Sequence, residues 1–282
     1  MSHYLFTYTT RCNSRFRFFP WLFLSLFTLS THAQNEPEFD FYLPVLSTNG
    51  ESLITQLTSA LKAADLDNIR VKTTTQWHTY QQSIRHGRDG IYLSSPHFSA
   101  WLKNKHNFTP ILKLSDTLSY VITVPTSDTD IFEIRDLVNK TICARPPLSL
   151  DYLLITQAFA NNVQSAEAHN VDSAVDELNK TQPPCTAFSI SEHEFSNLEA
   201  TTPGKYIRLI QGPRYSNYAV FASPSINRDT LDKFQRFLKL DNTKAIINPL
   251  LSNIDPDSTF INITNEDYTE KEAEILSTYW GQ

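Results

Sequence analysis

Residues 90–103 read GIYLSSPHFSAWLK, and this stretch decides the fold class. Residues 90–94 are an apolar run that predicts a short buried strand, and Pro96 suits the first turn of a helix over 96–103. The same alternation continues outward in both directions. Further strands are predicted over residues 40–46, 68–75, 111–114, 120–124, 141–144, 165–169, 185–190, 206–210 and 218–222, and further helices over 52–64, 77–86, 134–138, 150–160, 171–179, 230–240 and 269–279. This alternation predicts an α/β fold with mostly parallel sheets flanked by helices.

The pattern strand–helix–strand–helix–strand occurs once before Leu118 and once after Thr141, which predicts two similar lobes. A chain of 282 residues is also long enough for two domains. Residues 125–130 (PTSDTD) are rich in turn formers and are expected to cross between the lobes. The expected parts are a first lobe that starts with residues 34–119, a second lobe over 120–222, and a C-terminal helical segment over 223–282 that returns toward the first lobe.

The first 33 residues differ in composition from the rest. Arg11, Arg15 and Arg17 precede a run of 12 mostly apolar residues over 18–29, and small residues follow up to Ala33. This order is typical of a secretory signal peptide, and the run is shorter than the ~20 residues of a membrane span. We therefore expect cleavage after Ala33 and a periplasmic protein, with an uncleaved anchor as the alternative.

The charge balance argues against two classes of partner. The chain has 24 basic and 30 acidic residues. Loss of residues 1–33 removes three arginines and no acidic residue, which leaves 21 and 30, or a net charge of −9. We therefore expect neither nucleic acid nor an anionic membrane surface as a partner.

Cys143 and Cys185 are the cysteines that remain after cleavage. Two cysteines in an exported chain favour one disulfide, and both lie on predicted strands that would be neighbours in a doubly wound sheet. Two buried thiols that never meet are the alternative.

Three regions that follow predicted strands carry the candidate binding residues, because ligands of open α/β sheets bind at the carboxyl ends of strands. They are residues 94–97, residues 145–149 and the region of His169. Ser149 stands at the predicted start of a helix after Arg145, where free N–H groups favour an anion. The alternative is that Ser149 only caps its own helix. The loop with Ser94, Ser95 and His97 is similar, with a purely structural histidine as the alternative. Four aromatic residues are candidates for the walls of the cleft, with a place in the hydrophobic core as the alternative: Tyr42, Trp77, Tyr80 and Tyr92.

Motifs of common enzyme classes are missing from the sequence. It contains no Gly-x-Ser-x-Gly, no Gly-x-Gly-x-x-Gly, no Walker loop and no His-Glu-x-x-His. The histidines show no spacing typical of metal ligands, and His193 with Glu192 and Glu194 is expected to form a solvated face. We therefore expect a protein without catalytic activity, cofactor or metal.

The order of these signals resembles the periplasmic phosphate/phosphite/phosphonate-type solute-binding proteins of ABC transporters. The resemblance covers about residues 40–240. It rests on residues 40–44 (DFYLP), 90–97 (GIYLSSPH) with Trp101, 136–149 (DLVNKTICARPPLS), His169, and 185–190 (CTAFSI). It implies a type 2 periplasmic-binding-protein fold, in which two α/β lobes joined by two crossing segments close on a ligand. It also implies that the loop with Ser149 holds an oxyanion and that His169 lines the cleft from the second lobe.

The resemblance implies a protein that captures a small, phosphate- or phosphonate-like oxyanion and delivers it to an ABC permease. A ligand-sensing partner of a membrane histidine kinase or chemoreceptor is the alternative, and a monomer is expected in both cases. Phosphonate binders of this family carry a run of hydroxyl residues where residues 146–150 read PPLSL, so another small polar ligand stays open. The predicted ligand-binding residues are Tyr42, Tyr92, Ser94, Ser95, His97, Pro147, Ser149 and His169.

Overall fold

The computed structural model describes residues 38–44, 50–73, 77–128, 130–159, 164–167, 175, 184–251 and 256–281. The chain divides into two compact units, Met1–Glu36 and Pro37–Gln282, and every described residue belongs to the second. The predicted signal peptide over residues 1–33 therefore lies outside the described residues. In the part of the chain that is described, no helix has both the length and the apolar character of a membrane span.

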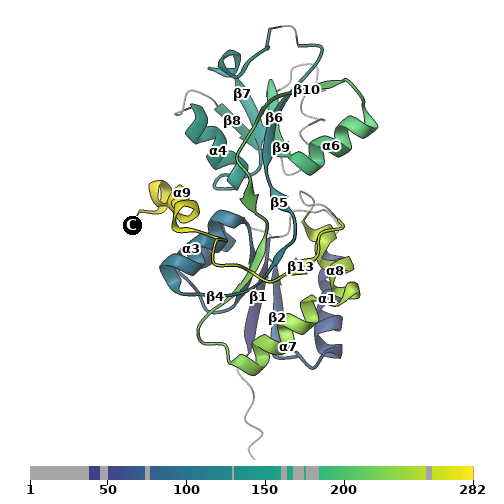
Figure 1. The fold of residues 1–282 in the computed structure, drawn as a ribbon, viewed down its shortest axis with the longest axis vertical. Helices are drawn as coiled ribbons and strands as arrows, with labels where there is room; N and C mark the ends of the chain where they lie inside the picture. The colour runs from purple at the N-terminus through teal and green to yellow at the C-terminus, as the bar shows by residue number, and fades with distance from the viewer. Residues whose placement is uncertain are drawn as a thin grey trace, which may run out of the picture. The chain divides into compact units, whose positions relative to one another are not determined.

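The first sheet has six strands in the order β13-β4-β12-β3-β1-β2 (Figure 1). Strand β1 pairs in parallel with β2 and β3, whereas β12 pairs antiparallel with β3 and β4. The bounds are β1 Phe39–Leu43, β2 Ile69–Thr73, β3 Ile91–Ser94, β4 Thr109–Leu114, β12 Ala219–Ala222 and β13 Phe260–Ile261.

The second sheet has five strands in the order β10-β6-β9-β7-β8. Strand β7 pairs in parallel with β8 and β9, and β6 pairs antiparallel with β9 and β10. In each sheet four strands thus run in one direction, which agrees with the expected mostly parallel sheets. The bounds are β6 Tyr120–Pro125, β7 Thr141–Ala144, β8 Gln164–Glu167, β9 Ala187–Ser191 and β10 Tyr206–Gln211.

A two-stranded ribbon, β5 (Thr117–Leu118) with β11 (Tyr215–Ser216), carries the chain between the sheets. Strand β5 lies between β4 of the first sheet and β6 of the second, and β11 lies between β10 and β12 on the way back. The expected crossing at residues 125–130 is wrong, because Pro125 ends β6 and the backbone N–H of Thr126 donates to Lys205 O at 2.8 Å. These turn formers end a strand and do not link two lobes.

The predicted helices that fall on described residues form close to their predicted positions. Residues 134–138 differ, because η1 is a short 3-10 helix. The predicted helix over 171–179 lies outside the described residues apart from residue 175, and α6 and α8 were not predicted. The bounds are α1 Gly50–Ala63, α2 Trp77–Arg85, α3 Pro96–His106, η1 Ile134–Leu137, α4 Leu150–Phe159, α6 Glu192–Thr201, α7 Arg228–Leu238, α8 Asp241–Ile247, η2 Asn248–Leu250 and α9 Glu270–Trp280.

The five-stranded sheet has a helix on each face (Figure 1). Ile155 and Phe159 of α4 pack with Ile142 on one face. Phe195 of α6 packs with Phe188 on the other. This follows from the alternation of side chains along a strand, which turns neighbouring residues to opposite faces.

The C-terminal segment packs on elements of the six-stranded sheet. Strand β13 pairs with β4, α8 contacts α1, and α9 contacts α3. Thr269 and Glu272 form a capping box at the start of α9, in which the backbone N–H of Thr269 donates to Glu272 Oε2 at 2.6 Å. The ring of Trp280 stacks on Phe98 with centroids 5.6 Å apart. The predicted bounds of the two lobes stay a prediction. Strand β12, which ends the predicted second lobe over residues 120–222, pairs with β3 and β4 and therefore belongs to the first sheet.

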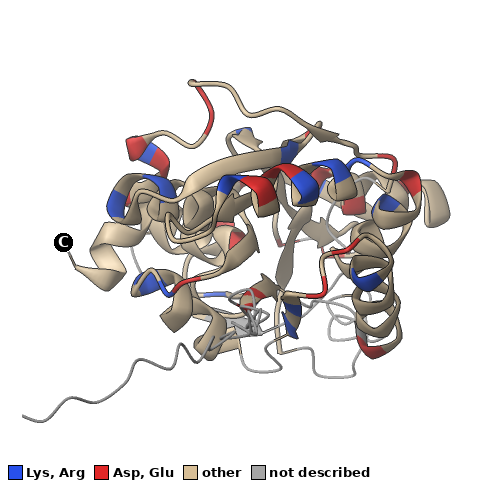
Figure 2. Cartoon of the chain, turned by 90° about the horizontal axis from the view of Figure 1, so that it is seen from below, with Lys and Arg blue, Asp and Glu red and all other residues tan. Residues whose placement is uncertain are grey.

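Charged residues of both signs alternate along the outer helices (Figure 2). On α7, for example, Arg228 pairs with Asp232 at 3.2 Å and Lys233 with Asp229 at 2.9 Å. Such exposed pairs contribute little to stability. They explain how this helix can present a polar surface while Phe234 and Phe237 stay in the core.

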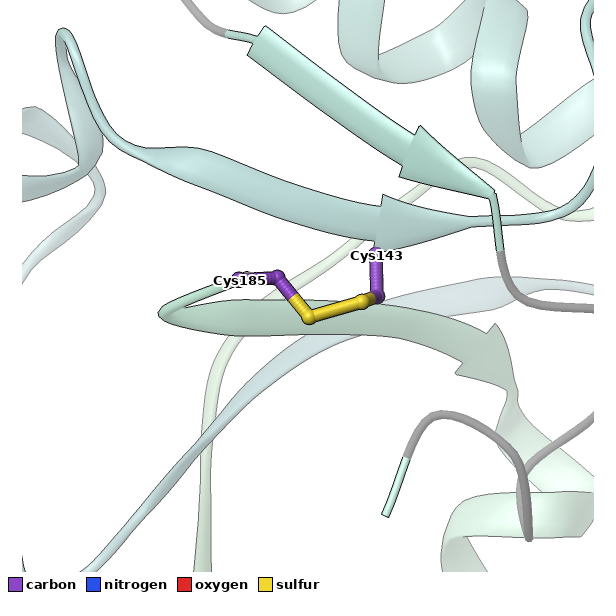
Figure 3. Close-up of a disulfide and its surroundings, with 2 residues drawn as sticks. All are labelled: Cys143 and Cys185. Carbon is purple, nitrogen blue, oxygen red and sulfur yellow. A yellow bond between two sulfur atoms is a disulfide. The ribbon is translucent and has the colours of Figure 1, made fainter. Parts of the chain in front are cut away.

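The predicted disulfide is confirmed (Figure 3). Cys143 lies on β7, Cys185 lies two residues before β9, and their Cα atoms are 5.6 Å apart. Because β7 and β9 are neighbouring parallel strands, the bond joins β7 to the segment that leads into β9.

Candidate ligand-binding site

The loop after β7 brings a buried serine to the start of α4. Pro146 and Pro147 follow Arg145, and the backbone N–H of Leu153 donates to Ser149 O at 3.0 Å, which makes Ser149 the residue that begins the helix. The residue is 6% exposed, and its Oγ has no hydrogen-bond partner among the described residues. Ser149 is therefore at the predicted place, but its hydroxyl does not cap the helix.

The loop after β3 brings a second serine to the start of α3. Ser95 is the N-cap of α3, with Pro96 at the first position, and its side chain also makes no capping bond. Instead, Ser95 Oγ lies 3.3 Å from His97 Nδ1. Ser94 differs, because its Oγ is 2.8 Å from Ser99 Oγ inside the core. Of the two serines in this loop, Ser95 therefore places its hydroxyl at the start of α3, whereas the hydroxyl of Ser94 lies in the core.

His97 joins this loop to the loop after β7. Its Nε2 is 3.0 Å from the carbonyl oxygen of Leu148, and a carbonyl only accepts, so Nε2 carries the proton. Burial lowers the pKa of His97 to about 4, and the bond to Leu148 only partly offsets that shift. At neutral pH the ring is therefore uncharged, and its Nδ1 accepts from Ser95.

This buried histidine should make the protein less stable in mild acid. An unfolded histidine titrates near pH 6.5 and folded His97 near 4, so only the unfolded chain gains the proton between these values. We expect the free energy of unfolding to fall by about 2 kcal/mol from pH 7 to pH 5 through this group. Urea unfolding at both pH values checks this.

The matched variants are His97→Gln, which should lose most of this pH-dependent difference, and His78→Gln at an exposed position, which should keep it. An equal pH dependence in wild type and His97→Gln would contradict the assignment.

Two further side chains of α2 bind the same loop. Trp77 Nε1 donates to the carbonyl oxygen of Pro147 at 2.8 Å, and Gln81 Nε2 donates to the same oxygen at 2.6 Å. Leu148 has a φ of +67°, which a branched side chain adopts only when its surroundings hold it there. Its side chain packs against the aromatic cluster of α2, α3 and β3. These contacts hold the loop of the second sheet on elements of the first.

Arg145 is the buried cation of the site. Its side chain is 4% exposed, its Nη2 lies 2.6 Å from Glu194 Oε2, and its Nη1 lies 3.6 Å from Asp151 Oδ2. Burial lowers the pKa of Arg145, but Glu194, Tyr120 and Asp151 together raise it well above its usual value, so the group stays charged. The ring of Tyr120 lies 5.3 Å from the guanidinium carbon. Within the described part of the chain, Nε and Nη1 have no hydrogen-bond acceptor.

A small cavity connects these groups. Its volume is about 10 Å³, close to the space that one water molecule needs. The starts of α3 and α4 both contribute to its wall, through Ser95 and Ser149. The other lining residues are Trp77, Tyr120, Arg145, Pro146, Leu150 and Tyr218.

The predicted site residues are thus only partly brought together. Ser95 and Ser149 line the cavity, and His97 and Pro147 take part in the contacts between the two loops. Tyr42 and Tyr92 lie elsewhere: their rings stack at 4.6 Å, and they bond to Asp40 and Arg88. His169 lies outside the described residues. The roles of the predicted residues in binding stay a prediction.

Two important residues were missed in the sequence. Arg145 belongs to the loop after β7, but no local signal in the sequence shows which acceptors its side chain faces. Glu194 was expected in a solvated face, yet it is 3% exposed and its Oε2 accepts from the backbone N–H of Ser191. The spacing Ser191-x-x-Glu194 is a capping box, and this signal could have identified both α6 and the buried glutamate.

Several solved structures have a fold similar to that of this chain. PhnD1 from Prochlorococcus marinus, in complex with methylphosphonate, is 13% identical, with a TM-score of 0.64 over 86% of this chain and 97% of that chain. A binding protein component of a phosphonate ABC transporter from Pseudomonas aeruginosa is 11% identical, with a TM-score of 0.58 over 86% and 95%. A Xanthomonas citri protein bound to chloride is 9% identical, with a TM-score of 0.59 over 85% and 96%. These similarities confirm the two-lobed α/β fold.

The sequence matches no curated relative. A family model does match residues 44–268, which is most of the chain. That model describes the periplasmic substrate-binding protein of phosphonate ABC transporters, a transport component. The order of strands, the two crossings and this match agree with each other, and the chain belongs to the family of periplasmic substrate-binding proteins of phosphonate ABC transporters.

Proposed function

We propose that this protein binds a small phosphate- or phosphonate-like oxyanion between the starts of α3 and α4 and delivers it to the permease of an ABC transporter. The observation that carries this proposal is a set of buried donors without acceptors at one cavity. They are the Ser149 hydroxyl and the Nε and Nη1 groups of Arg145.

These donors suit an oxyanion for two physical reasons. The first N–H groups of a helix have no acceptor within the helix, and the helix dipole favours negative charge at that end. A guanidinium adds fixed donors that match the geometry of a phosphoryl group. Glu194 and Asp151 share the charge of Arg145, so the hydroxyl and N–H donors would carry much of the binding.

Binding in this cavity would require the two loops to separate, because a tetrahedral oxyanion is several times larger than one water molecule. Separation breaks the bonds from Trp77 and Gln81 to Pro147 and from His97 to Leu148. We infer an equilibrium between open and closed forms, in which the ligand replaces part of these contacts. The methylphosphonate bound to the Prochlorococcus marinus protein supports a phosphonate as the first ligand to test.

A thermal-shift titration tests the ligand and its place together. Phosphate, phosphite, methylphosphonate and sulfate are compared, and a ligand at 100 times its Kd should stabilise the protein by about 2.7 kcal/mol. Ser149→Ala should weaken binding roughly tenfold through loss of one hydrogen bond to a charged ligand. Ser196→Ala, at an exposed position of α6, should bind as wild type does. No shift with any oxyanion, or equal shifts in both variants, would contradict the proposed site.

Membership of an ABC transporter family supports transport over sensing. We further infer that the protein acts as a monomer in the periplasm after export by residues 1–33, and that it binds its ligand without converting it. Recovery of unchanged methylphosphonate after incubation with the protein is the expected result.

A further inference from the structure

The second sheet carries a groove that is separate from the cavity between the loops. Its volume is about 360 Å³, within the range of small-molecule sites. Helix α4 connects β7 to β8, which lie at one edge of the sheet. The groove lies on the same face of the sheet, next to β6 and β10 near the opposite edge, which α4 does not cover. The wall is mostly apolar and includes Ile122, Ile134, Leu154, Ile155, Ala158 and Ile210.

One buried carboxylate, that of Asp151, is part of this apolar wall. Its side chain is 0% exposed. Asp151 Oδ2 accepts the backbone N–H of Arg145 at 3.0 Å and faces Arg145 Nη1 at 3.6 Å. Asp151 Oδ1 has no hydrogen-bond donor among the described residues. This oxygen is fully buried at the groove wall, so a ligand in the groove reaches it by displacing the apolar side chains beside it.

The charges around Asp151 indicate which ligand the groove can accept. Arg145, Asp151 and Glu194 are each at most 4% exposed, and their formal charges sum to −1. In the described part of the chain, the ion pairs of this cluster include no second cation. A buried acceptor without a donor is costly, and a ligand cation with an N–H group would satisfy it and balance the charge. A negatively charged group placed beside Asp151 Oδ1 in the groove would instead be repelled by that carboxylate.

We propose that this groove is a second binding site, which takes a small amphipathic cation: a primary amine whose ammonium group donates to Asp151 Oδ1 and whose alkyl or aryl tail packs on the apolar wall. The polar residues Gln157, Gln211 and Ser189 also line the groove. The groove shares Tyr120 with the cavity between the loops, but the binding groups differ. The proposal does not depend on the oxyanion site.

Hexylammonium is a suitable probe, because it joins one cation to a flexible apolar tail. Isothermal titration should detect its binding at millimolar concentration or below. 1-Hexanol, which has the same tail without the charge, should bind at least about tenfold more weakly, and hexanoate should not bind detectably. Equal binding of hexanol, binding of hexanoate, or no binding of hexylammonium would each overturn the proposal.

A matched pair of variants locates the probe. Ala158→Trp places an indole at an exposed position of the groove wall and should weaken hexylammonium at least about tenfold. Ala200→Trp makes the same change at an exposed position of α6 and should leave the affinity unchanged. Equal affinity in the two variants would overturn the location.

Asp151→Asn should remove the preference for hexylammonium over hexanol. Asp151 also pairs with Arg145, so this substitution can prevent folding. In that case the comparison of hexylammonium with hexanol and hexanoate, and the comparison of Ala158→Trp with Ala200→Trp, still test the proposal.

Discussion

Arg145→Met is expected to lower the free energy of unfolding by about 3–5 kcal/mol, because it leaves two buried carboxylates without their cation. Glu194 and Asp151 both lose their partner, at 2.6 Å and 3.6 Å in the structure. Methionine keeps much of the volume of the arginine stem, so the change tests charge more than packing. Denaturant unfolding of wild type and variant measures the difference.

Two further variants separate charge from other causes. Arg228→Met removes an arginine from an exposed pair with Asp232 and should cost less than about 1 kcal/mol. Glu194→Gln, added to Arg145→Met, should recover part of the loss, since it removes one of the unpaired charges. If the exposed and buried arginines cost the same, or if the second change adds to the first, the account of this cluster is wrong.

Loss of the Cys143–Cys185 bond is expected to lower the free energy of unfolding by about 4 kcal/mol. The bond closes a loop with a sequence separation of 42, and the chain-entropy model assigns that value to a loop of this length. Cys143→Ala with Cys185→Ala removes the bond while it keeps both buried positions apolar. Guanidinium unfolding with and without a reductant measures the effect in wild type.

The reductant should have no effect on the double alanine variant. A wild-type midpoint that does not move upon reduction would show that the bond does not hold the second sheet together.

Local chemistry explains why many elements could be predicted. Pro96 fits only the first turn of a helix, and Thr269 with Glu272 caps α9 through bonds within four residues. The same logic applies to α6, because the box Ser191–Glu194 is a local signal of a helix start, whereas the charge pattern of His193 between two glutamates predicts a solvated face. That error came from charge pattern and not from tertiary structure.

The candidate site was predictable only in part, because a local pattern does not show what a side chain faces. Ser149 and Ser95 were selected from their places after strands, and both line the cavity. Tyr42 and Tyr92 are the same kind of residue whether they stack in a core or line a cleft, and they stack on each other. The crossing was misplaced for a related reason, since turn formers such as those at 125–130 end a strand as readily as they link two lobes.

The sequence by itself determined the α/β alternation, the paired cysteines, the family resemblance and the helix starts after β3 and β7, because each depends on neighbours along the chain. Only the tertiary structure decided that Arg145 lies buried between Asp151 and Glu194, and that the carbonyls of Pro147 and Leu148 bind side chains of α2 and α3. It also decided that α4 leaves an apolar groove beside Asp151. These contacts join residues far apart in sequence, and their energies depend on burial, which is set only when the sheets and helices pack.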